Sequence, residues 1–148
     1  MGERAARAEA VAGLAVETIV AADCVEGMAA SLRAGLAAVE ARAVAVLVLL
    51  ADMPEVGVAD IDRLIAAFDP AEGREIVRAA TADGRPGHPV LFGRRFFEDL
   101  RGLGGDQGAR SILAAAADFV VEIPTTGDAA LVDLDTPEDW AAWRAGRA

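Results

Sequence analysis

The sequence predicts a single-domain α/β sandwich with a largely parallel sheet. Three observations support this class: the length of 148 residues, the 54% content of hydrophobic residues, and the alternation of helix-like and strand-like segments. A chain of this length suits one domain of ordinary size, and this composition supplies a real core. Helices that alternate with strands along a chain are typical of α/β folds.

Five segments of the N-terminal half follow this alternation. Glu3–Val11 is rich in alanine, which favours helix. Ala15–Val20 alternates and carries β-branched residues, which predicts a strand. Glu26–Val39 has apolar residues spaced for one helix face, as does Val58–Phe68. Ala43–Leu50 lies between these two helices and is apolar throughout, as expected of a strand covered on both sides.

The C-terminal half continues the pattern and ends in a helix with a clear start signal. Thr136 is a good N-cap, Pro137 suits the first helical position, and Asp139 stands three residues after the cap. The predicted elements are strands at Glu75–Ala80 and Pro89–Phe92 around the turn "ADGRPG", helices at Arg94–Leu100 and Gln107–Ala117, strands at Phe119–Ile123 and Leu131–Leu134, and a helix at Pro137–Arg144.

Charge and cysteine content exclude several function classes. The chain has 24 acidic and 14 basic residues, and all of the basic ones are arginine, so its net charge is −10. A nucleic-acid-binding surface is normally basic, and an anionic ligand here needs a local positive site or a metal ion. Cys24, the only cysteine, is interpreted as an inert small residue.

The N-terminus lacks the apolar stretch of a signal peptide, and no apolar run reaches the roughly 20 residues of a membrane span. We therefore expect a cytoplasmic protein.

Asp52 is the first candidate for function. It follows the apolar run "VLVLLA", at the expected carboxyl end of a strand, and Met53 and Pro54 come next. In open α/β sheets, ligands bind beyond the carboxyl ends of the strands. The alternative is a turn aspartate that hydrogen-bonds its own backbone.

A pair of acids in "LVDLDTPED" strengthens the case for a metal ion. Asp133 and Asp135 stand two residues apart, so they share a face if the segment is extended. Two like charges this close repel unless a cation or donors lie between them. Mg²⁺ commonly binds one or two carboxylates together with substrate phosphates. Asp135 is alternatively a cap or turn residue, and Glu138 and Asp139 simply suit the first turn of a helix.

Five motifs in a fixed order, "EGMAASLRAGL", "LLADMP", "GRPGHPVLF", "GDQGAR" and "LVDLDTPEDW", resemble the MobA-like nucleotidyltransferases. The closest branch is the molybdenum cofactor cytidylyltransferases. This resemblance runs from about Glu3 to the C-terminus. It implies a Rossmann-like three-layer sandwich of the nucleotide-diphospho-sugar-transferase kind. A phosphorelay receiver domain also alternates helix and strand, but it uses a strand-end lysine, and this chain has no lysine.

The resemblance implies a reaction in which CMP is transferred from CTP to the phosphate of the molybdenum cofactor (molybdopterin), and pyrophosphate is released. Asp52 would be the catalytic Mg²⁺ ligand, with Asp133 or Asp135 as the second. The chain offers no Ser/His/Asp or Cys/His set for nucleophilic catalysis. The partners implied are CTP or GTP, the cofactor and a molybdenum hydroxylase. The choice between CTP and GTP and the identity of the acceptor stay open.

Eight further positions match family segments one by one. Gly27 and Ser31 match the segment along the base and ribose of the nucleotide, although Ser31 is equally an ordinary helix serine. The positions that match segments facing the acceptor substrate are Gly87, His88, Pro89, Asp106, Gly108 and Arg110. For three of these an ordinary role is also open: a structural histidine, a helix N-cap and a solvated arginine.

One departure from the family is large. The family opens with a strand and a glycine-rich loop that holds the triphosphate, followed by a helix and a second strand. Residues 1–148 therefore look like a single MobA-like domain that lacks this first unit, and the edge of the Val46–Leu50 strand or its neighbour is expected to be unpaired and apolar. Three explanations are open: a fragment of a longer chain, a second chain that supplies the unit, or an inactive remnant. Such a remnant would bind the cofactor or serve molybdoenzyme maturation.

Overall fold

A computed structural model of the chain describes residues 3–21, 27–104 and 108–147. Cys24 and Asp106 lie outside these residues. The helices of the described part are α1 (Glu3–Ala10), α2 (Met28–Val39), α3 (Val58–Ala67), α4 (Phe97–Arg101), α5 (Arg110–Ala115) and α6 (Pro137–Ala145), with single 3₁₀ turns at Pro70–Glu72, Arg94–Phe96 and Ala117–Phe119. No described helix is both long and apolar enough to cross a membrane.

The described strands form one sheet in the order β1-β3-β2-β4. They are β1 (Ala45–Val48), β2 (Ile76–Ala80), β3 (Pro86–Gly93) and β4 (Val120–Pro124). β4 pairs with β2 in parallel, whereas β3 is antiparallel to both β1 and β2. The prediction of a mostly parallel sheet is thus only partly matched. The short turn between β2 and β3 explains this, because so short a connection can join only antiparallel neighbours.

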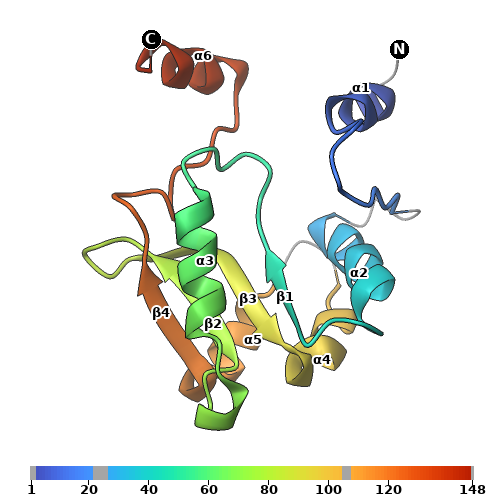
Figure 1. Cartoon of the computed structure of the whole chain (residues 1–148), viewed down its shortest axis with the longest axis vertical. Coiled ribbons are helices and arrows are strands. Elements are labelled where there is room, and N and C mark those ends of the chain that lie inside the picture. The colour runs from blue at the N-terminus through green and yellow to red at the C-terminus, as the bar shows by residue number, and fades with distance from the viewer. Residues whose placement is uncertain (1–2, 22–26, 105–107, 148) are drawn as a thin grey trace.

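Helices cover both faces of the sheet, and this confirms the predicted α/β layering (Figure 1). On one face, Leu64 of α3 packs in a core with Val77 and Leu91 of the sheet. On the other face, α2, α4 and α5 pack against Ile76 and Phe92. Side chains alternate between faces along each strand, so neighbours in sequence contribute to different cores.

Two predicted strands are wrong. Ala15–Val20 forms no strand, and all of its residues are exposed; no described strand pairs with it, so its alternating pattern has no core to face. Leu131–Leu134 is irregular as well. The Leu131 N–H donates to the Asp128 carbonyl in a turn, and the Leu134 N–H donates to the Asp52 carbonyl in the loop after β1. Neither amide therefore takes part in a sheet ladder.

The start signal of the last helix is confirmed. The Thr136 hydroxyl accepts from the Asp139 N–H at 3.1 Å, and the Asp139 carboxylate accepts from the Thr136 N–H at 2.9 Å. None of the described residues of α6 is buried, but the helix is tied to the body. Trp143 Nε1 and the Arg147 guanidinium both donate to Glu55, in the loop that follows β1.

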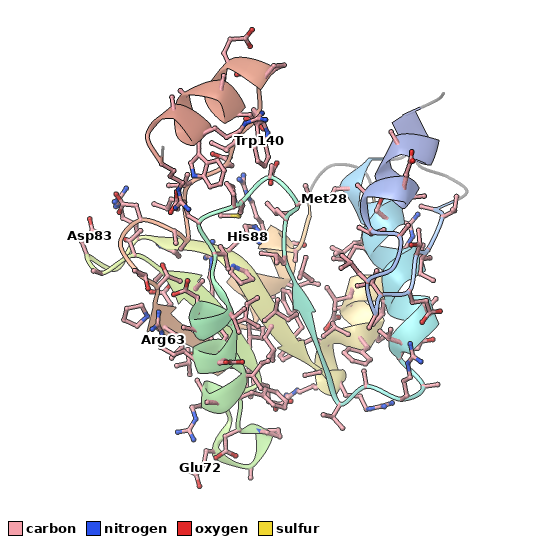
Figure 2. All side chains as sticks on the ribbon, turned by 45° about the horizontal axis from the view of Figure 1, so that its top comes forward. Met28, Arg63, Glu72, Asp83, His88 and Trp140 are labelled. Carbon is pink, nitrogen blue, oxygen red and sulfur yellow. The ribbon has the colours of Figure 1, made fainter. Side chains whose placement is uncertain are left out.

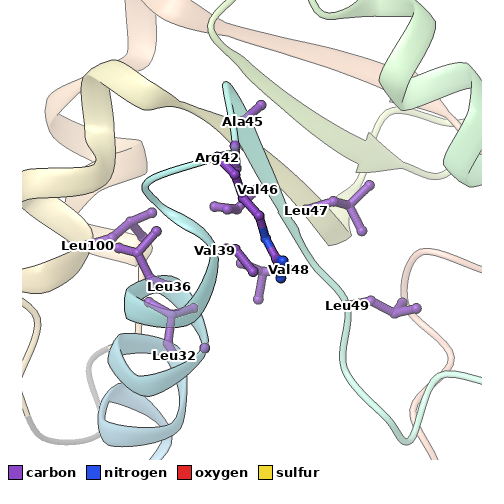
Figure 3. A pocket seen from close by; sticks show the side chains of 12 residues that line it. Leu32, Leu36, Val39, Arg42, Ala45, Val46, Leu47, Val48, Leu49 and Leu100 are labelled. Carbon is purple, nitrogen blue, oxygen red and sulfur yellow. The ribbon is translucent and has the colours of Figure 1, made fainter. Parts of the chain in front are cut away.

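An apolar groove lies along the outer side of β1. Of the described strands, β1 pairs only with β3, so its other edge is unpaired, as expected from the sequence. In Figure 3, Val46 and Val48 point toward α2, from which Leu36 and Val39 face them, while Leu47 points away. The groove encloses about 620 Å³.

Candidate functional site

The main chain brings Asp52 next to the second acidic segment. Asp52 stands in the turn after β1, and its backbone carbonyl accepts a 2.9 Å hydrogen bond from the Leu134 N–H. Leu134 is buried, and its two sequence neighbours are Asp133 and Asp135, both of which are exposed. One backbone hydrogen bond therefore places Asp52 beside the segment that carries Asp133 and Asp135, which is far from it in the sequence.

The Asp52 side chain has an unsatisfied acceptor. Its Oδ1 atom is buried and has no hydrogen-bond partner among the described residues. A buried carboxylate oxygen without a donor is costly, because it loses water and gains nothing in return. Within the described ranges, no group of three or more His, Cys, Asp or Glu side chains is close enough to hold a metal ion. The unpartnered oxygen of Asp52 is the kind of ligand that a divalent cation takes, but the described residues include no ready group of three carboxylates.

A cavity of about 440 Å³ lies beside these acids. Three polar side chains from three different elements line it: Arg78 of β2, His88 of β3 and Arg110 at the start of α5. Asp133 is its one acidic lining residue in the described part of the chain. Figure 2 places His88 at the end of the sheet near Met28 of α2, which also lines the cavity, with Trp140 of α6 beyond it. Leu32, Met53, Val90 and Leu113 are among the apolar side chains of its walls.

The structure brings most of the predicted acceptor residues together. Gly87, His88, Gly108 and Arg110 all line the cavity, and Pro89 is buried directly beside it in β3. Asp106 lies outside the described residues, so its predicted position is untested.

The two predicted nucleotide residues do not line this cavity. Gly27 caps α2 in a left-handed conformation with φ of 83°, which favours glycine, and Ser31 is exposed one turn into that helix. Their neighbours Met28, Ala29 and Leu32 line the cavity instead.

Backbone contacts with the loop before the acidic segment fix the position of His88. The His88 N–H donates to the Ala130 carbonyl at 2.9 Å, and Gly87 lies so close to Ala130 that a Cβ atom would stand 1.9 Å from the same oxygen. The loop is held in turn by Thr125, whose hydroxyl donates to the Ala80 carbonyl at 3.0 Å and accepts from the Ala130 N–H at 3.3 Å. β3 is therefore clamped against the segment that leads to Asp133.

The electrostatics of the cavity favour a neutral His88. Burial lowers its pKa from the ordinary value of 6.5, and the positive charges of Arg78 and Arg110 lower it further. The backbone of Val48 and the negative charge of Asp52 oppose this shift. Nδ1 of the ring is buried with no partner among the described residues.

This shift predicts a pH dependence of stability. Just below pH 6.5, His88 is protonated in the unfolded chain but still neutral in the folded chain, because its folded pKa is lower. The free energy of unfolding should therefore fall as the pH falls from 6.5 through the folded pKa. Above that window the contribution is constant. Urea unfolding across this range should show a flatter pH profile for His88→Gln than for the natural protein. Since the chain has one histidine, parallel profiles for the two proteins would contradict the assignment.

Sequence reasoning missed two polar side chains that shape this region. Arg78 lines the cavity from the middle of a strand, where a single charge in the sequence gave no signal. Asp60 is buried and links the start of α3 to the loop that follows β4. Its carboxylate accepts from the Gly57 N–H at 2.9 Å and from the Thr126 N–H at 3.0 Å, and it also binds Arg63. An aspartate three residues into a predicted helix was its only signal.

Comparisons with known proteins agree with one another. A family model described as the MobA-like NTP transferase domain matches residues 1–120. The purine catabolism protein PucB of Bacillus subtilis (strain 168) is 30% identical over 125 residues, which are 82% of this chain and 58% of PucB. The chain thus spans less than two thirds of that curated relative.

Solved structures show the same likeness. The crystal structure of Rv0371c from Mycobacterium tuberculosis H37Rv matches with a TM-score of 0.72 at 30% identity, covering 96% of this chain and 71% of that one. A complex of Rv0371c with manganese matches with a TM-score of 0.69 at 30% identity, covering 95% and 72%.

Proposed function

Because the chain belongs to the MobA-like NTP transferase family, we propose that it transfers CMP from CTP to the phosphate of the molybdenum cofactor in a Mg²⁺-dependent reaction. A phosphate oxygen of the acceptor attacks the α-phosphorus of CTP. The bond from that phosphorus to the oxygen bridging to the β-phosphate breaks, and pyrophosphate leaves. Both reacting groups are anionic, so the main task of the protein is to orient them and to offset their charge.

The observation that carries this proposal is the unpartnered, buried carboxylate oxygen of Asp52 beside the Asp133–Asp135 segment. Asp52, with Asp133 or Asp135, would hold the cation. A divalent cation there would screen the charge between the two anions and orient the triphosphate. The manganese complex of the related Rv0371c supports divalent-cation binding in this family.

The other residues divide between the two substrates. The cavity lined by His88, Gly87, Gly108 and Arg110 would bind the acceptor. Pro89, buried beside it, and Asp106, which lies outside the described residues, are assigned to the same substrate. Gly27 and Ser31 would lie along the base and ribose. His88 is held near neutrality by its surroundings, so it would serve the acceptor as a hydrogen-bonding group without adding charge.

An assay of pyrophosphate release tests the proposal. The protein, as the 148-residue chain and in the longest form that its reading frame encodes, would be incubated with Mg²⁺, molybdenum cofactor, and CTP or GTP. Release that requires both the cofactor and CTP is the expected result for the longest form. No release in either form would contradict the transferase activity, and faster release with GTP would contradict the choice of CTP.

A second candidate is binding of the cofactor without turnover, in support of molybdoenzyme maturation. It is favoured by the contrast between a well-formed cavity and the lack of a three-carboxylate group in the described ranges. Cofactor binding by a form that releases no pyrophosphate would identify this role.

A further inference from the structure

Arg78 lies in the middle of β2, between buried apolar residues, at a position where an apolar side chain would be expected. Side chains two apart on a strand share a face, so Arg78 lies on the same face of β2 as Ile76 and Ala80. Both of these neighbours are buried, and Ile76 belongs to the core under α2, α4 and α5. Arg78 itself is partly buried. Its charge therefore points into the layer between the sheet and the helices.

No carboxylate in the described part of the chain forms an ion pair with Arg78. Glu122 of β4 is paired with Arg78 in the sheet register, yet the two side chains form no ion pair. The hydrogen bond found for the Arg78 guanidinium is from Nε to the Gly87 carbonyl, at 3.1 Å, which leaves its terminal nitrogens for another partner. An arginine that served only stability would be expected to have a carboxylate partner, because an unpaired charge in a partly buried place is unfavourable.

The free donors of Arg78 lie in the same cavity as Arg110 and His88. Arg110 likewise has no carboxylate partner among the described residues, and the buried Nδ1 of His88 is unpartnered too. Two unpaired guanidinium groups lining one cavity form a local positive site in a chain whose net charge is −10. Planar guanidinium groups bind phosphate through paired hydrogen bonds.

We propose that Arg78 and Arg110 together bind the phosphate of the acceptor, and that the uncharged body of the acceptor packs on the apolar wall formed by residues such as Leu32, Val90 and Leu113. Arg78 thereby becomes a specificity residue, and the ligand class is an organic phosphomonoester. This inference rests on the proposed function, since that function makes the cavity an acceptor site.

Calorimetric titration of the full chain with phenyl phosphate, inorganic phosphate and phenol tests the proposal. Phenyl phosphate should bind most tightly, because it alone offers both the charge and an apolar body. Arg78→Met should weaken its binding about tenfold or more, the usual loss for a charge-assisted hydrogen bond. Arg78→Lys, which keeps the charge, should lose less. The matched control is Arg74→Met, since Arg74 is exposed and paired with Asp69 away from the cavity.

The single histidine supplies a second readout. At a fixed pH, phosphate should shift the imidazole NMR signals of His88 in the natural protein and in Arg74→Met, but not in Arg78→Met. Unchanged phenyl phosphate affinity in Arg78→Met, or inorganic phosphate binding as tightly as phenyl phosphate, would overturn the proposal. Arg78-dependent binding without pyrophosphate release would refute only the transferase activity. Release by Arg78→Met with an unchanged KM for the acceptor would refute only the subsite.

Discussion

Replacing Asp52 with alanine, in the longest form that the reading frame encodes, is expected to abolish nucleotidyl transfer and leave the fold intact. The activity should fall at least about a thousandfold, because a catalytic cation contributes several kcal/mol to the stabilisation of charge in the transition state. The fold should tolerate the change, since Oδ1 of Asp52 has no partner to lose and the bond from Leu134 goes to the backbone carbonyl. Pyrophosphate release and urea unfolding would be measured on the same preparation.

Two variants sharpen this experiment. Asp52→Asn keeps the shape of the side chain and removes only its charge, so it should be as inactive as Asp52→Ala. Asp62→Ala removes an exposed carboxylate from α3 and should retain full activity. Stabilisation of the protein by Mn²⁺ should disappear with either change at Asp52. Near-normal turnover in Asp52→Ala would rule out the metal role.

Replacing Gly87 with alanine is expected to destabilise the protein severely. The new Cβ would stand 1.9 Å from the Ala130 carbonyl oxygen and 2.6 Å from its carbon, so backbone would have to move. That movement would break the hydrogen bond from the His88 N–H to the same oxygen. We expect a loss of about 3 kcal/mol or more in the free energy of unfolding, and a melting temperature lower by roughly 10 °C.

Gly35 offers a control of opposite sign. It lies in the middle of α2, and a Cβ added there meets no atom within 4 Å. Gly35→Ala should therefore stabilise the protein by about 0.5–1 kcal/mol, the usual gain for this change inside a helix. Circular dichroism during urea unfolding would compare both variants with the natural protein. Equal stability of Gly87→Ala and the natural protein would contradict this prediction, because it would mean that the backbone at Ala130 can move away from the new Cβ atom at little cost.

Local signals explain how much of the fold could be predicted from the sequence. The cap at Thr136, the apolar run that became β1 and the turn between β2 and β3 each depend on a few neighbouring residues, and all three were predicted correctly. Ala15–Val20 has an equally strong strand pattern, but a strand also needs an edge to pair with, and that requirement is not local.

The candidate site shows the same division. Asp52 could be singled out because a charge that ends an apolar strand is unusual. Arg78 could not, because its significance depends on the absence of a partner across the sheet. For Gly87 the sequence predicts only a role in substrate binding. Its close approach to Ala130 joins segments far apart in the chain, and a sequence does not reveal such proximity.

The strand order has a consequence for how this molecule assembles. Only β2 and β3 are neighbours both along the chain and in the described sheet, so they can close a short hairpin at little cost in chain entropy. Longer stretches of chain separate β1 and β4 from this hairpin, and each of these strands pairs with one of its two edges. Arg78 and His88 sit on the hairpin itself. The residues that we assign to recognition thus belong to the segment on which the remaining strands assemble, so selection for ligand and selection for rapid folding act on the same stretch of chain.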